Sequence, residues 1–186
     1  MQEQIHLNIQ NGNVRSKEEF DLFFQKYYSL FLSFTYRYRL SQEEAEDIVQ
    51  EVFIHFWEQR FNFSDIISIK VFFYRSIRNR CLNYFKHEEI RERYADSVAK
   101  IESEDFLQEN IIREEVSFFI REEIKQLPER EQQILILSLS GKSNQEIAEQ
   151  LSIAITTVKT HKTRAYAQLR KTLSELRIIL TILALH

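Results

Sequence analysis

The chain has 186 residues, 44% of them apolar, and can form one large domain or two small ones with modest cores. It contains only two glycines and one proline. Because tight β-hairpins and phosphate-binding loops depend on glycine, this composition disfavours both and favours an all-α fold. The single cysteine, Cys81, excludes an internal disulfide framework and a cysteine-rich zinc site.

Neither end of the chain carries a predicted membrane segment. The opening residues, MQEQIHLNIQ, lack the basic region and the apolar core of a secretory signal peptide. The longest apolar run, residues 178–185 interrupted by Thr181, is too short to span a bilayer. We therefore expect a cytoplasmic protein that does not itself insert into a membrane.

Charge is distributed unevenly along the chain, although the net charge is only -3. Residues 1–86 hold eleven acidic and eleven basic side chains, but the bases within residues 70–86 have no acidic neighbour. Residues 87–115 hold ten acids against four bases, and residues 128–186 hold five acids against eight bases. Two basic helical regions separated by an acidic bridge indicate a nucleic-acid partner.

The first predicted helical unit is rich in aromatic residues. Its first helix repeats apolar residues at helical spacing, and we expect these to form core: Phe20, Phe23, Phe24, Tyr27, Leu30, Phe31 and Phe34. The sequence SQEE at residues 41–44 predicts a capping box that starts a second helix. Its expected inner face holds Ala45, Ile48, Val49, Val52, Phe56 and Trp57. Its outer face holds Asp47, Gln50, Glu51, Ile54 and Glu58, and such an acidic stripe is normally only solvated.

A third helix is predicted over residues 69–86, IKVFFYRSIRNRCLNYFK. Its inward stripe would hold Phe73, Ile77, Cys81 and Tyr84, with Phe72, Tyr74 and Phe85 near the seam. The outward stripe would hold Arg75, Arg78, Asn79, Asn83 and Lys86. Cations interleaved with half-exposed rings are typical of single-stranded nucleic-acid binding. The alternative is an ordinary amphipathic helix with core aromatics.

The C-terminal part predicts a helix-turn-helix. A helix opens at Pro128 and stops at Gly141, and SNQE at residues 143–146 is a second predicted capping box. A short helix follows, then a three-residue turn at 152–154, then a helix from Ile155 with Val158, Ala165 and Leu169 inward. In such units the second helix enters the DNA major groove.

The outer face of this last helix offers cations and hydroxyls to phosphates and base edges: Thr156, Thr157, Lys159, Thr160, Thr163 and Arg164. The alternative is a solvated basic face on a protein-interaction module. Gly141-Lys142-Ser143 is not a P-loop, because Ile136 stands where that loop needs glycine.

Three segments together resemble bacterial RNA polymerase sigma factors of the extracytoplasmic-function (ECF) type, in the sigma-70 family. They are EEAEDIVQEVFIHFW, FFYRSIRNRCLNYFK and LPEREQQILILSLSGKSNQEIAEQLSIAITTVKTHKTRAYAQLRK, in that order. The resemblance implies two small helical domains joined by an acidic linker. Residues 1–86 would be region 2, residues 87–120 the linker, and residues 121–186 region 4 with an apolar C-terminal tail.

The resemblance also implies partners and site residues. Region 2 would dock on core RNA polymerase through Asp47, Gln50 and Glu51. It would melt the minus-ten promoter element, on the non-template strand, through Arg75, Arg78, Asn79, Asn83, Tyr84 and Lys86. Region 4 would contact the polymerase flap and read the minus-thirty-five element with Lys159, Thr160, Thr163 and Arg164, while Thr156 and Thr157 contact phosphates. A membrane-anchored anti-sigma factor is the expected regulator.

The linker length is compatible with this reading. Promoter elements two duplex turns apart are separated by ~70 Å. An extended linker of roughly thirty residues reaches up to ~100 Å. Two departures from the family pattern lie at the start of the last helix: Ser152 stands where many members have glycine, and Ala154 where a serine cap is usual. The tail RIILTILALH is expected to pack on the protein or be covered by a partner.

Two other classes of protein fit the sequence less well. A response-regulator type of helix-turn-helix transcription factor shares the motif TVKTH, but it needs an alternating strand–helix receiver domain, and the first half has helical periodicity instead. An enzyme is disfavoured because the histidines are scattered, without metal-ligand spacing or a paired nucleophile. We therefore predict no catalytic residue, metal or cofactor.

Overall fold

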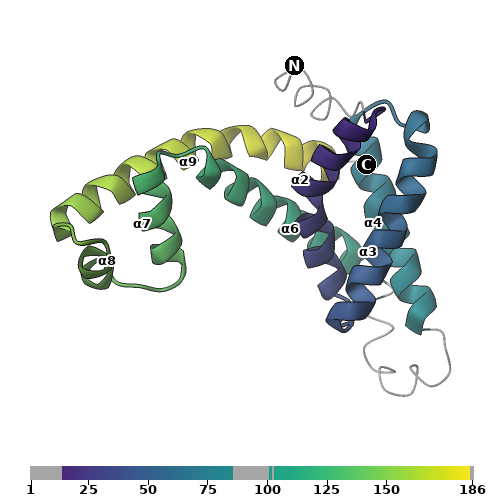
Figure 1. Ribbon diagram of the computed structural model, residues 1–186, viewed down its shortest axis with the longest axis horizontal. Coiled ribbons are helices and arrows are strands. Elements are labelled where there is room, and N and C mark those ends of the chain that lie inside the picture. Colours follow the sequence, from purple (N-terminus) through teal and green to yellow (C-terminus); the bar gives the residue numbers. More distant parts are fainter. Residues whose placement is uncertain (1–13, 86–100, 102, 185–186) are drawn as a thin grey trace. The chain divides into compact units, whose positions relative to one another are not determined.

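The computed structural model describes residues 14–85, 101 and 103–184, with side chains as far as Arg170. The regular elements of these residues are helices, shown in Figure 1, and none of the described residues forms a strand. The all-α prediction is therefore confirmed. The elements are α2 (Lys17–Tyr36), α3 (Gln42–Gln59), the 3₁₀ turn η1 (Arg60–Asn62), α4 (Ile66–Phe85), α6 (Glu104–Lys125), α7 (Glu129–Leu139), α8 (Asn144–Leu151) and α9 (Ile155–Ala184).

The chain divides into two compact units, Met1–Glu114 and Glu115–His186. We call them the N-terminal unit and the C-terminal unit. The boundary falls within α6, so the first part of that helix belongs to one unit and the second part to the other. Among the described residues, no helix combines the length and apolar character that crossing a membrane requires.

Capping boxes start both α2 and α3, because a serine and a glutamate three residues later satisfy each other's free amides. At α3, the Ser41 backbone N–H donates to Glu44 at 2.8 Å and the Glu44 N–H donates to the Ser41 hydroxyl at 3.3 Å, as predicted. The corresponding pair at α2, Ser16 and Glu19, was missed in the sequence although its spacing is the same. Glu19 also accepts the Arg15 N–H at 2.8 Å.

The core of the N-terminal unit is a cluster of phenylalanine rings from α2, α3 and α4. The rings of Phe31 and Phe73 stack with centroids 4.2 Å apart, and Phe53 meets Phe73 edge-on at 4.6 Å. Phe23 and Phe56 are fully buried beside them. Burial of each such ring stabilises the fold by about 1.5–3 kcal/mol. Phe53, which was in neither predicted face of its helix, is therefore a central core residue.

The acidic linker predicted over residues 87–120 is not confirmed. Residues 104–120 lie in α6, and several of its side chains are buried, among them Leu107, Glu114 and Phe118. The negative net charge concealed a helix in which apolar residues recur at helical spacing, with Glu104, Asp105 and Glu109 exposed and Glu114 buried. The rest of the predicted linker, apart from Ile101 and Ser103, lies outside the described residues.

Two small aliphatic clusters hold the C-terminal unit together. One joins Ile124 and Leu127 to Leu135 of α7 and Ala165 of α9. The other lies inside the helix-turn-helix and joins α7, α8 and α9 through Ile134, Ile147, Ala148 and Val158. Val158 and Ala165 were predicted to point inward, and both are buried.

The helix ends and turns of the C-terminal unit agree with most of the sequence-based predictions. The Ser143–Glu146 capping box starts α8 as predicted. Pro128 is the N-cap of α7 and not its first helical residue. Ser152 ends α8 in the left-handed conformation, with φ 53° and ψ 47°. A glycine adopts this conformation without steric strain, whereas the Cβ of a serine disfavours it.

Candidate nucleic-acid interface

On α4, the predicted outward residues fall into separate groups. Arg75, Asn79 and Asn83 are exposed and follow one another at four-residue intervals, so they form a polar stripe along one helix face. Ile67 and Val71, 42% and 38% exposed, continue this stripe toward the start of the helix. Lys86 lies outside the described residues.

The other two predicted residues of α4 are engaged within the protein. The Arg78 side chain is only 19% exposed and its guanidinium lies 3.7 Å from the Glu104 carboxylate of α6. The Tyr84 hydroxyl donates to the Glu44 carboxylate, joining α4 to the capping box of α3. That hydrogen bond is the main reason why the pKa of Glu44 is lowered.

The aromatic residues expected near the seam of α4 are less available than predicted. Tyr74 and Phe85 are 2% exposed and belong to the core. Phe72 is half-buried, with its ring 5.1 Å from that of Phe63. The helix is therefore amphipathic with core aromatics, and the polar part of its exposed stripe consists of Arg75, Asn79 and Asn83. Burial also raises the pKa of the Cys81 thiol, which leaves it unreactive at neutral pH.

The outer face of α3 is exposed as predicted. Asp47, Gln50 and Glu51 all face solvent, and Ile54 beside them is 61% exposed. Glu51 forms an ion pair with Arg80 of α4, so it is tied to the neighbouring helix. A large exposed isoleucine within a carboxylate stripe is suited to a protein partner that offers both apolar and basic groups.

The helix-turn-helix presents its predicted residues together on α9. Thr156, Lys159, Thr160, Thr163 and Arg164 are exposed, and Thr157 is half-buried. The Thr160 hydroxyl donates to the Thr156 carbonyl and the Thr163 hydroxyl to the Lys159 carbonyl, each at 3.0 Å. Their hydroxyl protons are therefore occupied, and these side chains offer acceptor lone pairs and methyl groups to DNA.

Side-chain contacts fix α9 against α7 and α8. The Lys162 ammonium donates to the Asn144 side chain at 3.2 Å. His161 lies 3.6 Å from the buried carboxylate of Glu131, near the start of α7. The Arg130 guanidinium donates to the Leu151 carbonyl at 3.0 Å, close to the turn. The first two contacts hold α9 in place, and the third joins α7 to the end of α8. The outer face of α9 has no acidic side chain between residues 156 and 171.

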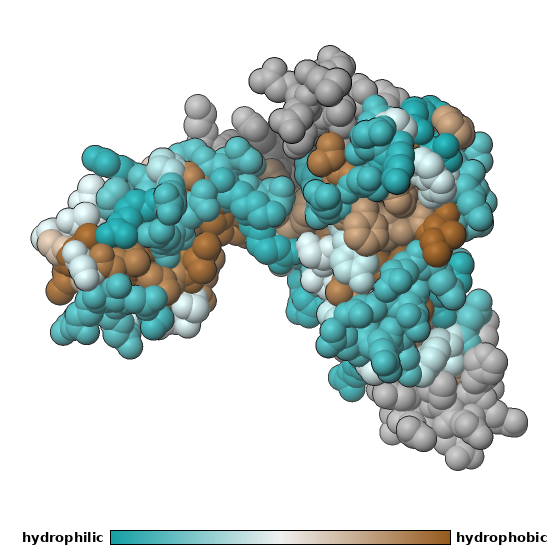
Figure 2. Space-filling model, viewed as in Figure 1, coloured by the Kyte–Doolittle hydropathy of each residue, from teal (hydrophilic) through white to brown (hydrophobic). Residues whose placement is uncertain are grey.

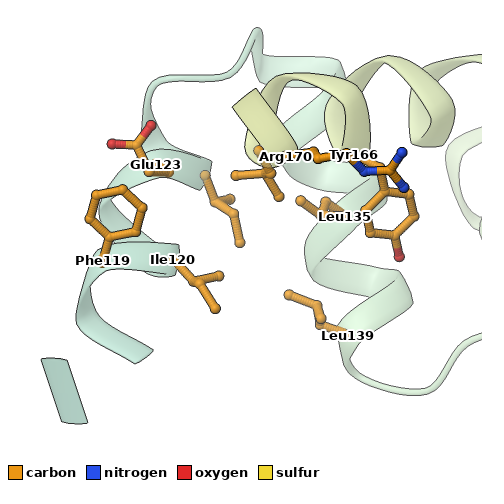
Figure 3. Close-up of a pocket in the computed structure, with 9 residues that line it drawn as sticks. Phe119, Ile120, Glu123, Leu135, Leu139, Tyr166 and Arg170 are labelled. Carbon is orange, nitrogen blue, oxygen red and sulfur yellow. The ribbon is translucent and has the colours of Figure 1, made fainter. Parts of the chain in front are cut away.

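A pocket of about 440 Å³ lies inside the C-terminal unit, between the second part of α6, α7 and α9 (Figure 3). Its apolar wall includes Ile120, Leu135 and Leu169, and Glu123 and Arg170 also line it. Leu139 and Tyr166, 64% and 45% exposed, also line it. Brown patches on this unit in Figure 2 show that apolar side chains reach its surface. Local sequence patterns did not predict this pocket.

A cluster of arginine and aromatic side chains between α3 and α4 was also missed. The Arg60 guanidinium lies over the rings of Trp57 and Phe61, 3.6 and 4.2 Å from their centroids. Arg15 donates to the carbonyls of Phe61 and Phe63 at 3.1 and 3.3 Å. The run RFNF at residues 60–63 was the available sequence signal, since arginine stacks readily on aromatic rings. Among the described residues, no group of metal-ligand side chains comes together.

Comparison with known proteins links both units to one family. The family model described as "Sigma-70 region 2" matches residues 23–90, and "Sigma-70, region 4" matches residues 120–169. The RNA polymerase sigma-H factor of Pseudomonas aeruginosa is 26% identical over 94% of each chain. The RNA polymerase sigma factor YlaC of Bacillus subtilis is 23% identical over 88% of this chain and 97% of its own length. The sigma factor SigZ of the same organism is 27% identical over 71% of this chain and 74% of its own.

Proposed function

Because the chain belongs to the sigma-70 family of bacterial RNA polymerase sigma factors, of the ECF type, we propose that its two units divide promoter recognition between them. The protein directs polymerase to promoters at transcription initiation, and the polymerase supplies the catalysis. The response-regulator alternative finds no support, because the described part of the N-terminal unit contains no strand of a receiver domain.

In our proposal, α9 reads the minus-thirty-five element in the major groove. The exposed cationic and hydroxyl face of α9, carried by a capped helix-turn-helix, is the observation on which the proposal chiefly rests. Lys159 and Arg164 are suited to guanine edges or phosphates, and Thr160 and Thr163 to exocyclic amines and thymine methyl groups. Thr156 and Thr157, at the helix start, are assigned to phosphates.

The α4 stripe is proposed to capture the melted minus-ten element. Arg75, Asn79 and Asn83 share one exposed face, and the spacing suits a strand whose phosphates pair with arginine while bases bond to amides. Arg78 is included in this role although it contacts Glu104 in the free chain. Tyr84 and Lys86 complete the assignment.

The α3 stripe is proposed to dock on core polymerase. Asp47, Gln50 and Glu51 would supply polar contacts, and exposed Ile54 the apolar centre. The pocket of the C-terminal unit is proposed to receive an apolar element of the polymerase flap, because it is concave and mainly lined by apolar side chains. A membrane-anchored anti-sigma factor would regulate the protein by covering these surfaces in the cytoplasm.

Run-off transcription with purified core polymerase tests the proposal. Adding the chain should produce transcripts from defined start sites that core polymerase alone does not make. Asp47→Lys should weaken capture of core polymerase, whereas Asp21→Lys, an exposed change of equal charge on α2, should not. A chain that neither binds core polymerase nor changes its start sites would refute the assignment.

A further inference from the structure

The first part of α6 covers the predicted DNA-binding face of α4 at one point. We propose that this segment is an intramolecular latch, in which an acidic helix occupies Arg78 until single-stranded DNA displaces it. The inference rests on the proposed role of α4 in capturing the minus-ten strand. All of the contacts that carry it lie within the N-terminal unit.

The Glu104–Arg78 pair is the inhibitory contact. The Glu104 carboxylate lies 3.7 Å from the Arg78 guanidinium, and the two side chains are 66% and 19% exposed. Glu104 therefore meets Arg78 where a DNA phosphate would pair with it. The Glu104 carboxylate repels an approaching phosphate and competes with it for the Arg78 guanidinium, so DNA binding at Arg78 is weakened until Glu104 moves away.

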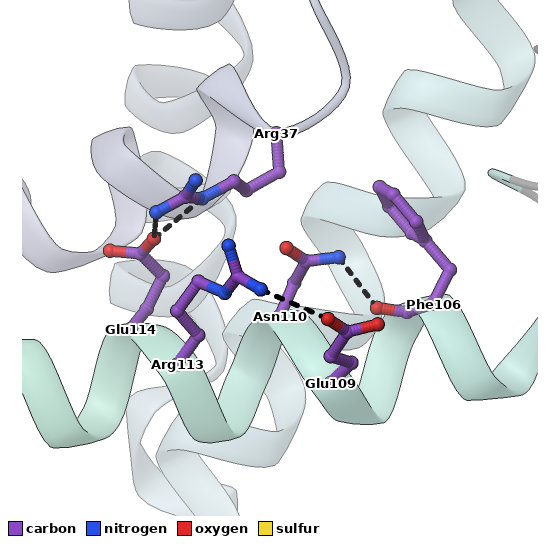
Figure 4. A network of polar contacts seen from close by, with 6 residues as sticks. All are labelled: Arg37, Phe106, Glu109, Asn110, Arg113 and Glu114. Atoms are coloured by element: carbon purple, nitrogen blue, oxygen red, sulfur yellow. Dashed lines mark hydrogen bonds and ion pairs between the residues drawn. The ribbon is translucent and has the colours of Figure 1, made fainter.

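A second ion pair anchors the helix in this position. The Arg37 guanidinium, at the end of α2, donates to the Glu114 carboxylate at 2.7 Å, and the Glu114 side chain is only 2% exposed (Figure 4). A buried carboxylate without its partner is strongly unfavourable. Loss of Arg37 should therefore drive Glu114, and the helix that carries it, toward solvent.

Apolar contacts between the two ion pairs complete the latch. The rings of Phe106 and Tyr38 meet edge-on with centroids 5.4 Å apart, and Leu107 is 6% exposed. Asn110, also buried, donates to the Phe106 carbonyl within the helix at 2.7 Å and so has its amide satisfied (Figure 4). The first part of α6 thus packs through a small apolar face with an ion pair at each end. So small a contact can open without unfolding the rest of the N-terminal unit.

Binding of the full-length chain to a labelled single-stranded deoxyoligonucleotide of mixed sequence tests the latch. Glu104→Gln should tighten binding about two- to five-fold, the range expected for loss of a partly exposed ion pair. Asp105→Asn is the matched control, because Asp105 is exposed, also lies in the first turn of α6 and changes net charge equally. It should have a smaller effect.

Arg37→Met separates the latch from bulk charge. Loss of a positive charge by itself weakens DNA binding. Arg37→Met should nevertheless tighten binding, because it releases the first part of α6 from the N-terminal unit. Amide hydrogen exchange over residues 104–114 should rise in the same variant. Should Arg37→Met not fold, the Glu104→Gln and Asp105→Asn pair still decides the question, since both side chains are exposed.

These variants distinguish failure of the latch from failure of the proposed DNA-binding role of α4. Equal effects of Glu104→Gln and Asp105→Asn, or weaker binding by a folded Arg37→Met variant, would overturn the latch. Arg75→Ala should weaken binding in either case. If Arg75→Ala leaves DNA binding unchanged, α4 does not bind DNA. The latch would then have no DNA-binding step to control.

Discussion

The two units are stabilised in different ways. The N-terminal unit buries a cluster of phenylalanine rings between three helices, whereas the clusters of the C-terminal unit consist of isoleucine, leucine, valine and alanine. Less apolar area is buried per residue by such small side chains, so helix ends and turns carry a larger share of stability. Both units contain capping boxes, at Ser16 and Ser41 in the first and at Ser143 in the second. In the second unit the loss of a cap therefore removes a larger fraction of a smaller total stability.

The largest expected effect concerns the ring cluster. Phe73→Ala should lower the free energy of unfolding of the N-terminal unit by about 3–5 kcal/mol, because the cavity left between Phe31 and Phe53 cannot collapse fully. Urea titration with hydrogen exchange read separately in each unit would measure it. Ile134→Ala, the control in the C-terminal unit, should loosen only that unit. An equal rise in amide exchange in both units, caused by either variant, would contradict the idea that each unit is stabilised by its own core.

The next effect concerns the exposed face of α9. Arg164→Ala should weaken binding of the polymerase-bound chain to a promoter duplex by about 1–3 kcal/mol if Arg164 contacts a base edge. Fluorescence anisotropy with a labelled duplex at fixed salt would measure it. Arg121→Ala, an exposed cation on α6, should change affinity far less. Similar losses for both would indicate a general charge effect and not recognition by α9.

Removing the caps tests the comparison directly. Ser41→Ala and Ser143→Ala each delete the hydroxyl of a capping box and should each cost about 1 kcal/mol. Because the C-terminal unit has the smaller core, the second change should expose a greater fraction of its amides to exchange. A larger effect at Ser41 would contradict the idea that caps matter more in the second unit.

Each unit contains, in its described part, one non-glycine residue in the left-handed backbone conformation, and replacing it with glycine should stabilise that unit. Ser152 and Arg39 have φ of 53° and 60°, and glycine at either position relieves steric strain worth about 1 kcal/mol. Thermal unfolding should shift upward for Ser152→Gly and Arg39→Gly. Gly141→Ala, at φ 89°, should shift it downward. No shift in any of the three would show that the turns tolerate strain by local rearrangement.

The smallest expected effect is on the pH dependence of stability. Hydrogen bonds from the Tyr84 hydroxyl and the Ser41 N–H lower the pKa of Glu44, and bonds with Ser143 lower that of Glu146. Both glutamates therefore stabilise the fold above the unfolded-state pKa near 4.5, and this contribution is lost as pH falls through the lower folded-state value. Glu44→Gln and Glu146→Gln should flatten stability curves in this acidic range, and unchanged curves would contradict the assignment.

Local sequence patterns predicted the helices and their exposed faces well. The predicted outer residues of α3, and those of α9 except the half-buried Thr157, are exposed, because helical periodicity decides which side of a helix faces the core. The capping boxes at Ser41 and Ser143 were readable for the same reason, since they depend on residues three positions apart.

Contacts between distant segments were not predictable in this way. Arg78 was expected to face outward, but it meets Glu104, which follows it by 26 residues and was assigned to a linker. Arg37 and Glu114 are 77 residues apart, and no periodicity connects them. The pocket of the C-terminal unit is likewise made by three helices together. Local spacing carries no information on which surfaces meet.

The stacking of Arg60 on Trp57 has a practical consequence. Trp57 is the only tryptophan of the chain, and the guanidinium lies 3.6 Å above its ring. Its indole emission should therefore respond when the turn at residues 60–62 moves. An unlabelled chain thus carries a built-in optical probe of that turn, which can be followed in real time while polymerase and promoter are added.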